Sequence, residues 1–171
     1  KVPYIPAFLD FKEGSTTFQD RILSLNDPLS DKKYSSFYFK ESLRSLYTSV
    51  TFLDGDEKNK ILIISSCLPS EGKSLLNILF AQTLTELGKK VLLIDCDLRK
   101  PTIHKRFGLN NIKGISNYLT GKVSKIEDVF QDVDFEDNLK VITSGMIPPD
   151  PLRILESDKM KDLIKDLKNN D

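Results

Sequence analysis

A short loop at residues 67–74 constrains the fold of this 171-residue chain more than any other feature. It reads CLPSEGKS and follows an apolar, β-branched run at residues 60–66. After it, leucines and a phenylalanine recur at helical spacing over residues 76–87, and Gly88 stands where a helix C-terminal cap belongs. A strand, then Gly-Lys-Ser, then a helix is the context of a phosphate-binding loop. The pattern departs from the general motif at Cys67, where glycine is usual.

The loop residues have separate expected roles in holding ATP and Mg²⁺. Gly72 lets the backbone approach a phosphate, Lys73 reaches the β- and γ-phosphates, and Ser74 offers a hydroxyl to Mg²⁺. The positive end of the following helix adds to the attraction. The alternative is that Gly-Lys-Ser is an ordinary helix start. The expected nucleotide-binding residues are Pro69, Ser70, Glu71, Gly72, Lys73, Ser74, Leu75 and Arg99.

Two carboxylates follow the next apolar run along the chain. Residues 91–95 read VLLID, a second buried strand that ends in Asp95, and Asp97 follows two residues later. The strand, helix and strand predict a βαβ unit with parallel strands. Ligands of such sheets bind at the carboxyl ends of the strands, so both carboxylates are expected to face the phosphate site and Mg²⁺. Helix capping or a solvated loop is the alternative role for each Asp.

The rest of the pattern predicts one α/β P-loop domain with a mainly parallel sheet flanked by helices. A third short strand is expected at residues 139–143, and Asp150 with Pro151 predicts the start of a closing helix. Apolar residues at helical spacing predict an amphipathic helix of about three turns from Glu41. Residues 1–38 are expected to form an extended arm or linker, and residues 39–171 to form the P-loop domain.

Composition excludes several other classes of protein. Lys and Arg number 25 and Asp and Glu number 25, so no global charge favours a nucleic-acid partner. The longest apolar runs are far shorter than the roughly 20 residues of a membrane-spanning helix. The two cysteines lack the spacing of a zinc site, and a reducing cytoplasm fits best. A start at Lys1 rather than Met suggests a processed piece of a longer protein.

Four ordered motifs resemble the cytoplasmic domain of the bacterial tyrosine kinases, the BY-kinases that regulate capsular and exopolysaccharide export as polysaccharide co-polymerases. The resemblance covers residues 39–163, and its motifs lie at residues 65–74, 88–101, 114–121 and 144–151. It implies an ATP-dependent protein-tyrosine autokinase. It also implies homo-oligomers, a membrane-spanning chain-length regulator as a segment or subunit, tyrosine substrates in trans, and a cytoplasmic position at the inner face of the membrane.

By this resemblance, Lys73 and Ser74 belong to the Walker A motif, and Asp95 and Asp97 to the Walker A' motif. The implied catalytic residues are Lys73, Asp95 and Asp97, and the implied Mg²⁺ ligands are Ser74, Asp95 and Asp97. Asp95 is also implied to act on the attacking tyrosine hydroxyl. Glu41 and Arg44 match the start of the family's ExxRxxR oligomerisation motif, although Tyr47 replaces its last Arg. An i,i+3 ion pair on an exposed helix face is the alternative.

Two family features are not found in the sequence. No apolar run ending in Asp, the Walker B strand, follows residue 95, and no Tyr follows Tyr118. We therefore expect the front part of a kinase domain, with a sheet that is incomplete at its C-terminal side and with weak or absent catalysis by this chain alone.

Three other functions remain open on sequence grounds. A partition or division-site ATPase shares the fold, but its signature Lys would stand at Leu68. An adenylylsulfate kinase has a similar acidic stretch and does not explain residues 145–151. An ATP-responsive scaffold that regulates assembly without phosphorylating tyrosine is the non-enzymatic alternative.

Overall fold

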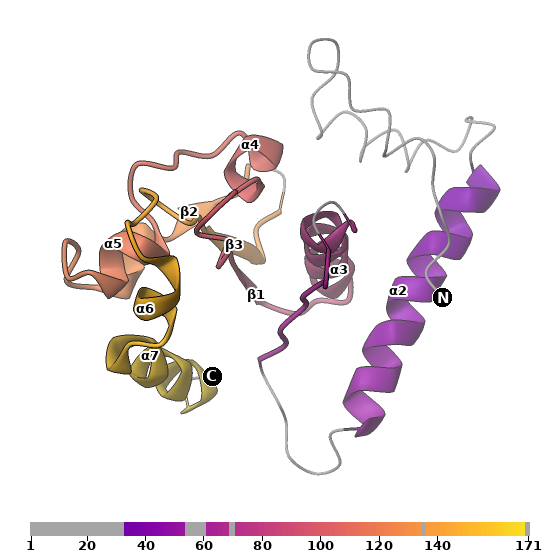
Figure 1. The fold of residues 1–171 in the computed structure, drawn as a ribbon. Coiled ribbons are helices and arrows are strands. Elements are labelled where there is room, and N and C mark those ends of the chain that lie inside the picture. Colours follow the sequence, from indigo (N-terminus) through magenta and orange to yellow (C-terminus); the bar gives the residue numbers. More distant parts are fainter. Residues whose placement is uncertain (1–32, 54–60, 69–70, 135, 170–171) are drawn as a thin grey trace. The chain divides into compact units, whose positions relative to one another are not determined.

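The computed structural model describes residues 33–53, 61–68, 71–134 and 136–169 (Figure 1). The chain divides into two compact units, Lys1–Gly55 and Asp56–Asp171. Most of the arm expected at residues 1–38 lies outside the described residues. No helix among the described residues has both the length and the apolar character needed to cross a bilayer.

The first unit contains one described helix, α2, Lys33–Leu53. It begins well before Glu41, so the arm and domain boundary expected at residue 38 falls inside a helix. Hydroxyl side chains on α2 donate to the carbonyl four residues earlier, as Ser42 does to Tyr38 and Thr48 to Arg44. These bonds give the Ser and Thr hydroxyl groups partners within the helix.

The second unit contains a sheet of three short strands: β1 (Val91–Ile94), β2 (Gln131–Asp132) and β3 (Leu139–Ile142). The strand order is β1-β3-β2. β1 pairs with β3 in parallel, from Val91 opposite Leu139 to Ile94 opposite Ile142, and β2 pairs with β3 antiparallel. The strands expected at residues 91–95 and 139–143 are thus confirmed, each ending one residue earlier than expected, as is the α/β class.

Two helix positions in this unit agree with the sequence pattern: the helix expected at residues 76–87 and the helix expected to begin at Pro151. The longest in this unit is α3, Lys73–Glu86, which contacts both β1 and β3. Gly88 follows with a φ of 75°, the left-handed conformation expected of a glycine after a helix. The other helices are α4 (Ile103–Phe107), α5 (Ile115–Leu119), the 3₁₀ helix η2 (Ile126–Val129), α6 (Pro151–Leu155) and α7 (Asp158–Asn169).

The start of α6 forms as expected. Pro151 occupies its first turn, and the Asp150 carboxylate accepts a hydrogen bond of 3.2 Å from the Arg153 N–H. This bond satisfies one of the N–H groups that a helix leaves without a partner in its first turn. The cap fixes where the chain turns after the loop that follows β3.

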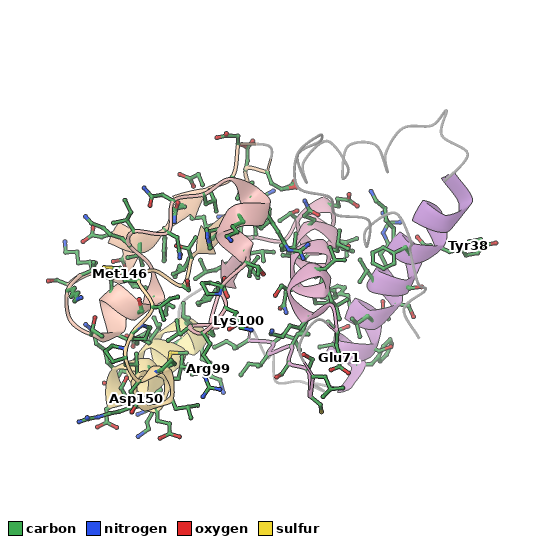
Figure 2. All side chains as sticks on the ribbon, turned by 45° about the horizontal axis from the view of Figure 1, so that its top comes forward. Tyr38, Glu71, Arg99, Lys100, Met146 and Asp150 are labelled. Atoms are coloured by element: carbon green, nitrogen blue, oxygen red, sulfur yellow. The ribbon has the colours of Figure 1, made fainter. Side chains whose placement is uncertain are left out.

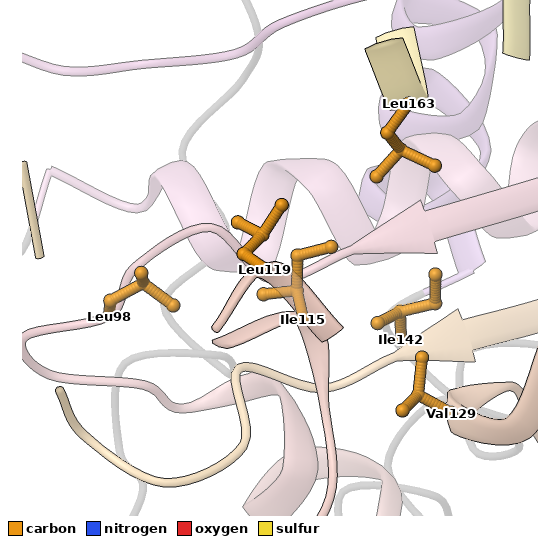
Figure 3. Close-up of a cluster of buried hydrophobic side chains, with 6 residues drawn as sticks. All are labelled: Leu98, Ile115, Leu119, Val129, Ile142 and Leu163. Carbon is orange, nitrogen blue, oxygen red and sulfur yellow. The ribbon is translucent and has the colours of Figure 1, made fainter. Parts of the chain in front are cut away.

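A cluster of buried side chains joins the sheet to the helices that follow it. Its members come from the loop after β1, from α5, η2, β3 and α7, so packing ties together segments far apart in sequence (Figure 3). They are Leu98, Ile115, Leu119, Val129, Ile142 and Leu163.

One expected strand does not form. Residues 61–66 pair with no strand of the described sheet, and Leu62 and Ile63 are 46% and 80% exposed. The apolar, β-branched composition favours a strand, but a strand becomes stable only when a neighbour satisfies its backbone groups and covers its side chains. The first strand of the expected βαβ unit is therefore absent from the described residues, and the prediction of a strand buried on both faces is wrong here.

Candidate functional site

The N-terminus of α3 begins with a glycine in the left-handed conformation. Gly72 caps the helix with a φ of 89°, and its carbonyl accepts a bond of 2.8 Å from the Leu76 N–H. A side chain at Gly72 would meet nothing within 4 Å, so its glycine is explained by conformation and not by crowding. Lys73, Ser74 and Leu75 follow in the first turn of the helix. Pro69 and Ser70 lie outside the described residues.

Glu71 stabilises the described part of the loop. Its carboxylate accepts a hydrogen bond of 3.0 Å from the Leu68 N–H, and Ser66 Oγ donates to the Leu68 carbonyl over 3.0 Å. The sequence predicted Glu71 only as one of the nucleotide-binding positions. A carboxylate three residues after an N–H in a tight loop is a signal of such local capping.

Asp95 sits at the end of β1 and is almost completely buried. Its side chain is 4% exposed; one carboxylate oxygen accepts from the Asp97 N–H at 3.1 Å and the other from the Ile103 N–H at 3.3 Å. Burial raises the pKa of this carboxyl above its ordinary value, and the backbone hydrogen bonds oppose that rise. Asp95 thus holds the start of the loop between β1 and α4.

Asp97 lies on the same loop, and its side chain contacts the first residue of α3. One of its oxygens accepts from the N–H groups of Arg99 and Lys100, at 3.3 and 2.9 Å. The other lies 2.9 Å from Lys73 Nζ. Burial opposes ionisation of Asp97, but the Lys100 N–H and the Lys73 ammonium outweigh it and hold the pKa of the carboxyl below its ordinary value.

The structure therefore brings together some of the expected site residues and separates others. Lys73 and Asp97 are in direct contact, and Asp95 bonds to the backbone of Asp97. Arg99 and Lys100 are exposed on the same loop, as Figure 2 shows. Glu41 and Arg44 belong to the other unit, where they form an ion pair of 2.8 Å with both side chains nearly half exposed.

Comparison with known proteins finds relatives of this chain among tyrosine kinases. No family model matches the chain. The chain is 38% identical over 152 residues to tyrosine-protein kinase YwqD of Bacillus subtilis, covering 89% of this chain and 60% of that protein. The VpsO kinase domain matches with a TM-score of 0.62 and 36% identity, over 77% of this chain and 67% of that one.

The chain belongs to the bacterial tyrosine kinases. The kinase domain of the Escherichia coli tyrosine kinase ETK agrees with this, with a TM-score of 0.79 and 29% identity over 99% of this chain and 63% of that one. The agreement with solved kinase domains supports the P-loop fold. The chain spans 60% of the length of YwqD.

The stretches at residues 114–121 and 144–151 lie against each other, with their backbones in close contact. A Cβ at Gly114 would lie 2.2 Å from the Thr143 carbonyl oxygen, so only glycine fits there. The Asn117 side-chain oxygen accepts from the N–H groups of Gly114 and Met146, at 3.1 and 3.4 Å. These contacts explain residues 114–121 and 144–151 as parts of one structural crossing, which the sequence presented as separate motifs.

The donor atoms at the site suit Mg²⁺, the metal ion that membership of this kinase family implies. No group of three or more His, Cys, Asp and Glu side chains able to hold a metal occurs among the described residues. Mg²⁺ commonly takes one or two carboxylates and completes its shell with phosphate and water oxygens. The part-buried Asp97 carboxylate and the Ser74 hydroxyl fit that pattern. Asp95 already accepts two backbone N–H groups, although carboxylate oxygens retain further lone pairs.

Proposed function

We propose that this chain is the ATP-Mg-binding part of a protein-tyrosine autokinase that regulates capsular or exopolysaccharide synthesis and export. The observation that carries the proposal is the contact of 2.9 Å between Lys73, at the start of α3, and Asp97, after β1. It puts a phosphate-binding cation and a metal-binding carboxylate at one place, as phosphoryl transfer requires. Family membership supports tyrosine as the acceptor.

Each residue of the site has a proposed task. Lys73 binds the β- and γ-phosphates of ATP, while Ser74 and Asp97 hold Mg²⁺, which neutralises charge on the phosphates. Arg99, exposed on the loop after β1, adds a second cation for the phosphates. Asp95 holds that loop through the Asp97 and Ile103 N–H groups and is the proposed acceptor of the tyrosine hydroxyl proton. The raised pKa of Asp95 suits a proton acceptor.

The remaining assignments of the family are part of the same proposal. Residues 39–171 are proposed as the kinase part and residues 1–38 as the arm. Glu41 and Arg44 form a ready ion pair on an exposed face of α2, and we propose that in an oligomer they contact a second copy of the chain. A membrane-spanning chain-length regulator, at the cytoplasmic face of the bacterial membrane, is the proposed partner.

The Lys73→Met variant tests the nucleotide site. We expect its affinity for a fluorescent ATP analogue with Mg²⁺ to fall by roughly tenfold or more, because charge-assisted bonds to phosphate contribute about 1.5–3 kcal/mol. Lys122→Met is the matched control, since Lys122 is exposed on the turn after α5. The far-ultraviolet circular dichroism of both variants is expected to match the parent. Equal affinity of Lys73→Met and parent would contradict the phosphate-binding role.

The acceptor is tested by transfer of labelled γ-phosphate from ATP to a copolymer of glutamate and tyrosine. Tyrosine labelling by the chain, lost in Lys73→Met, supports the kinase assignment. Hydrolysis of ATP by the chain without labelling of tyrosine would instead favour the partition-type ATPase.

A further inference from the structure

We propose that Asp97 is a specificity-determining residue: by holding Lys73 in an ion pair, it makes this site select a metal-complexed nucleotide over the metal-free nucleotide. The proposal rests on the proposed function, and it adds a physical reason for weak binding of ATP that carries no metal ion.

The ion pair is built into the fold on both sides. Lys73 is fixed at the first residue of α3, and its side chain is 34% exposed. The Asp97 side chain is 24% exposed, and its second oxygen is held by the Arg99 and Lys100 N–H groups. Asp95, buried at the end of β1, bonds the N–H of Asp97 itself. Two backbone N–H bonds to the carboxylate, and one from the Asp97 N–H to Asp95, thus hold Asp97 in place against Lys73.

This arrangement opposes the binding of a bare polyphosphate. A phosphate oxygen that reaches Lys73 must compete with a carboxylate 2.9 Å from the same ammonium. The phosphate and Asp97 would then be two like charges at close range, and partial burial weakens solvent screening of their repulsion. The favourable Lys73–phosphate contact is offset by loss of the Lys73–Asp97 contact.

A polyphosphate that carries Mg²⁺ changes the balance of charge. The Asp97 oxygen released by Lys73 becomes a ligand of the cation, since Mg²⁺ prefers carboxylate oxygens, and Lys73 takes a phosphate oxygen. Every charged group then keeps an oppositely charged partner. Asp97 therefore penalises only the form of the nucleotide that brings no cation.

The test compares ATP affinity in EDTA and in Mg²⁺ for the parent chain and for Asp97→Asn. Asparagine keeps an oxygen for the Arg99 and Lys100 N–H groups and removes the charge. We expect the variant to bind metal-free ATP roughly three- to tenfold more tightly than the parent, and to gain less affinity when Mg²⁺ is added. Asp132→Asn, which removes an 87% exposed carboxylate on β2, is the charge control and keeps the parental values.

A second measurement needs no nucleotide. Acetylation of the free chain with an amine-reactive ester, followed by peptide mass spectrometry, reports how readily Lys73 leaves its partner. We expect Asp97→Asn to raise the Lys73 acetylation rate by roughly threefold or more, with unchanged rates at the exposed Lys89 and Lys122. Asp97→Glu retains the charge, so this variant, unlike Asp97→Asn, is expected to keep the preference for metal-complexed ATP.

The outcomes separate the two proposals. Unchanged metal-free affinity together with unchanged Lys73 acetylation in Asp97→Asn would overturn the selectivity role. A parent chain that binds ATP in neither EDTA nor Mg²⁺ would overturn the proposed function and the selectivity with it, while the acetylation rates would still report the ion pair itself.

Discussion

Residues 61–66 and strand β1 are both short apolar runs that lead into the candidate site, yet they differ in structure. β1 pairs in parallel with β3, and Leu93 in its middle is buried. Residues 61–66 belong to no strand of the described sheet, and Ile63 is 80% exposed. The two runs have the same kind of side chains, so composition does not explain the difference.

The difference lies in hydrogen-bonding partners. The Val91 N–H donates to the Asn138 carbonyl, and the Asp95 N–H donates to the Ile142 carbonyl, so β3 satisfies the backbone at both ends of β1. Such pairing fixes Asp95, and through it the loop that carries Asp97. The comparison teaches that the acidic half of the site rests on paired backbone, whereas the segment entering the phosphate-binding loop lacks such support among the described residues.

The largest expected effect contrasts the same substitution at the two kinds of position. Ile142 in β3 is completely buried, so Ile142→Ala removes packed methyl groups and is expected to cost about 2–5 kcal/mol in the free energy of unfolding. Ile63→Ala is expected to change it by less than about 0.5 kcal/mol. Urea unfolding measures both. A similar loss in the two variants would show that residues 61–66 are packed in solution and would break the comparison.

An intermediate effect is expected at the end of β1. In Asp95→Asn, the amide group cannot accept the second backbone N–H, so the Asp97 or the Ile103 N–H loses its partner at a cost of about 1–3 kcal/mol. We also expect Asp95→Asn to lose more affinity for ATP in the presence of Mg²⁺ than in its absence. Calorimetry with and without Mg²⁺ measures this, and Asp132→Asn is the control. Unchanged metal dependence would exclude Asp95 as a ligand of Mg²⁺.

The smallest effect concerns the ion pair between Lys73, at the start of α3, and Asp97, after β1. Because the folded-state pKa of Asp97 lies below its ordinary value of 3.8, its contribution to stability is present above that value and is lost as the pH falls through the folded-state pKa. Asp97→Asn is therefore expected to be less stable than the parent by about 0.5–1 kcal/mol at neutral pH. The difference should vanish in strong acid. Urea unfolding across this pH range measures it, and a pH-independent difference would exclude the ion pair as its source.

The sequence pattern predicted the helices and caps that depend on hydrogen bonds between residues close in sequence. The apolar periodicity of α3, Gly88 after its end, and Asp150 with Pro151 at the start of α6 all indicate hydrogen bonds between residues close in sequence. The early start of α2 at Lys33 was missed because residues 33–40 include serines, which are weak helix signals.

The sequence by itself determined the residue types at the site: a glycine able to adopt a φ of 89°, a lysine at the start of α3, and two carboxylates directly after β1. Only the tertiary structure decided that Lys73 contacts Asp97 while Asp95 turns both oxygens to backbone N–H groups. It also decided which apolar run became a strand. Both outcomes depend on groups distant in sequence meeting in space, and spacing along the chain carries no record of which partner a charge or a strand edge will find.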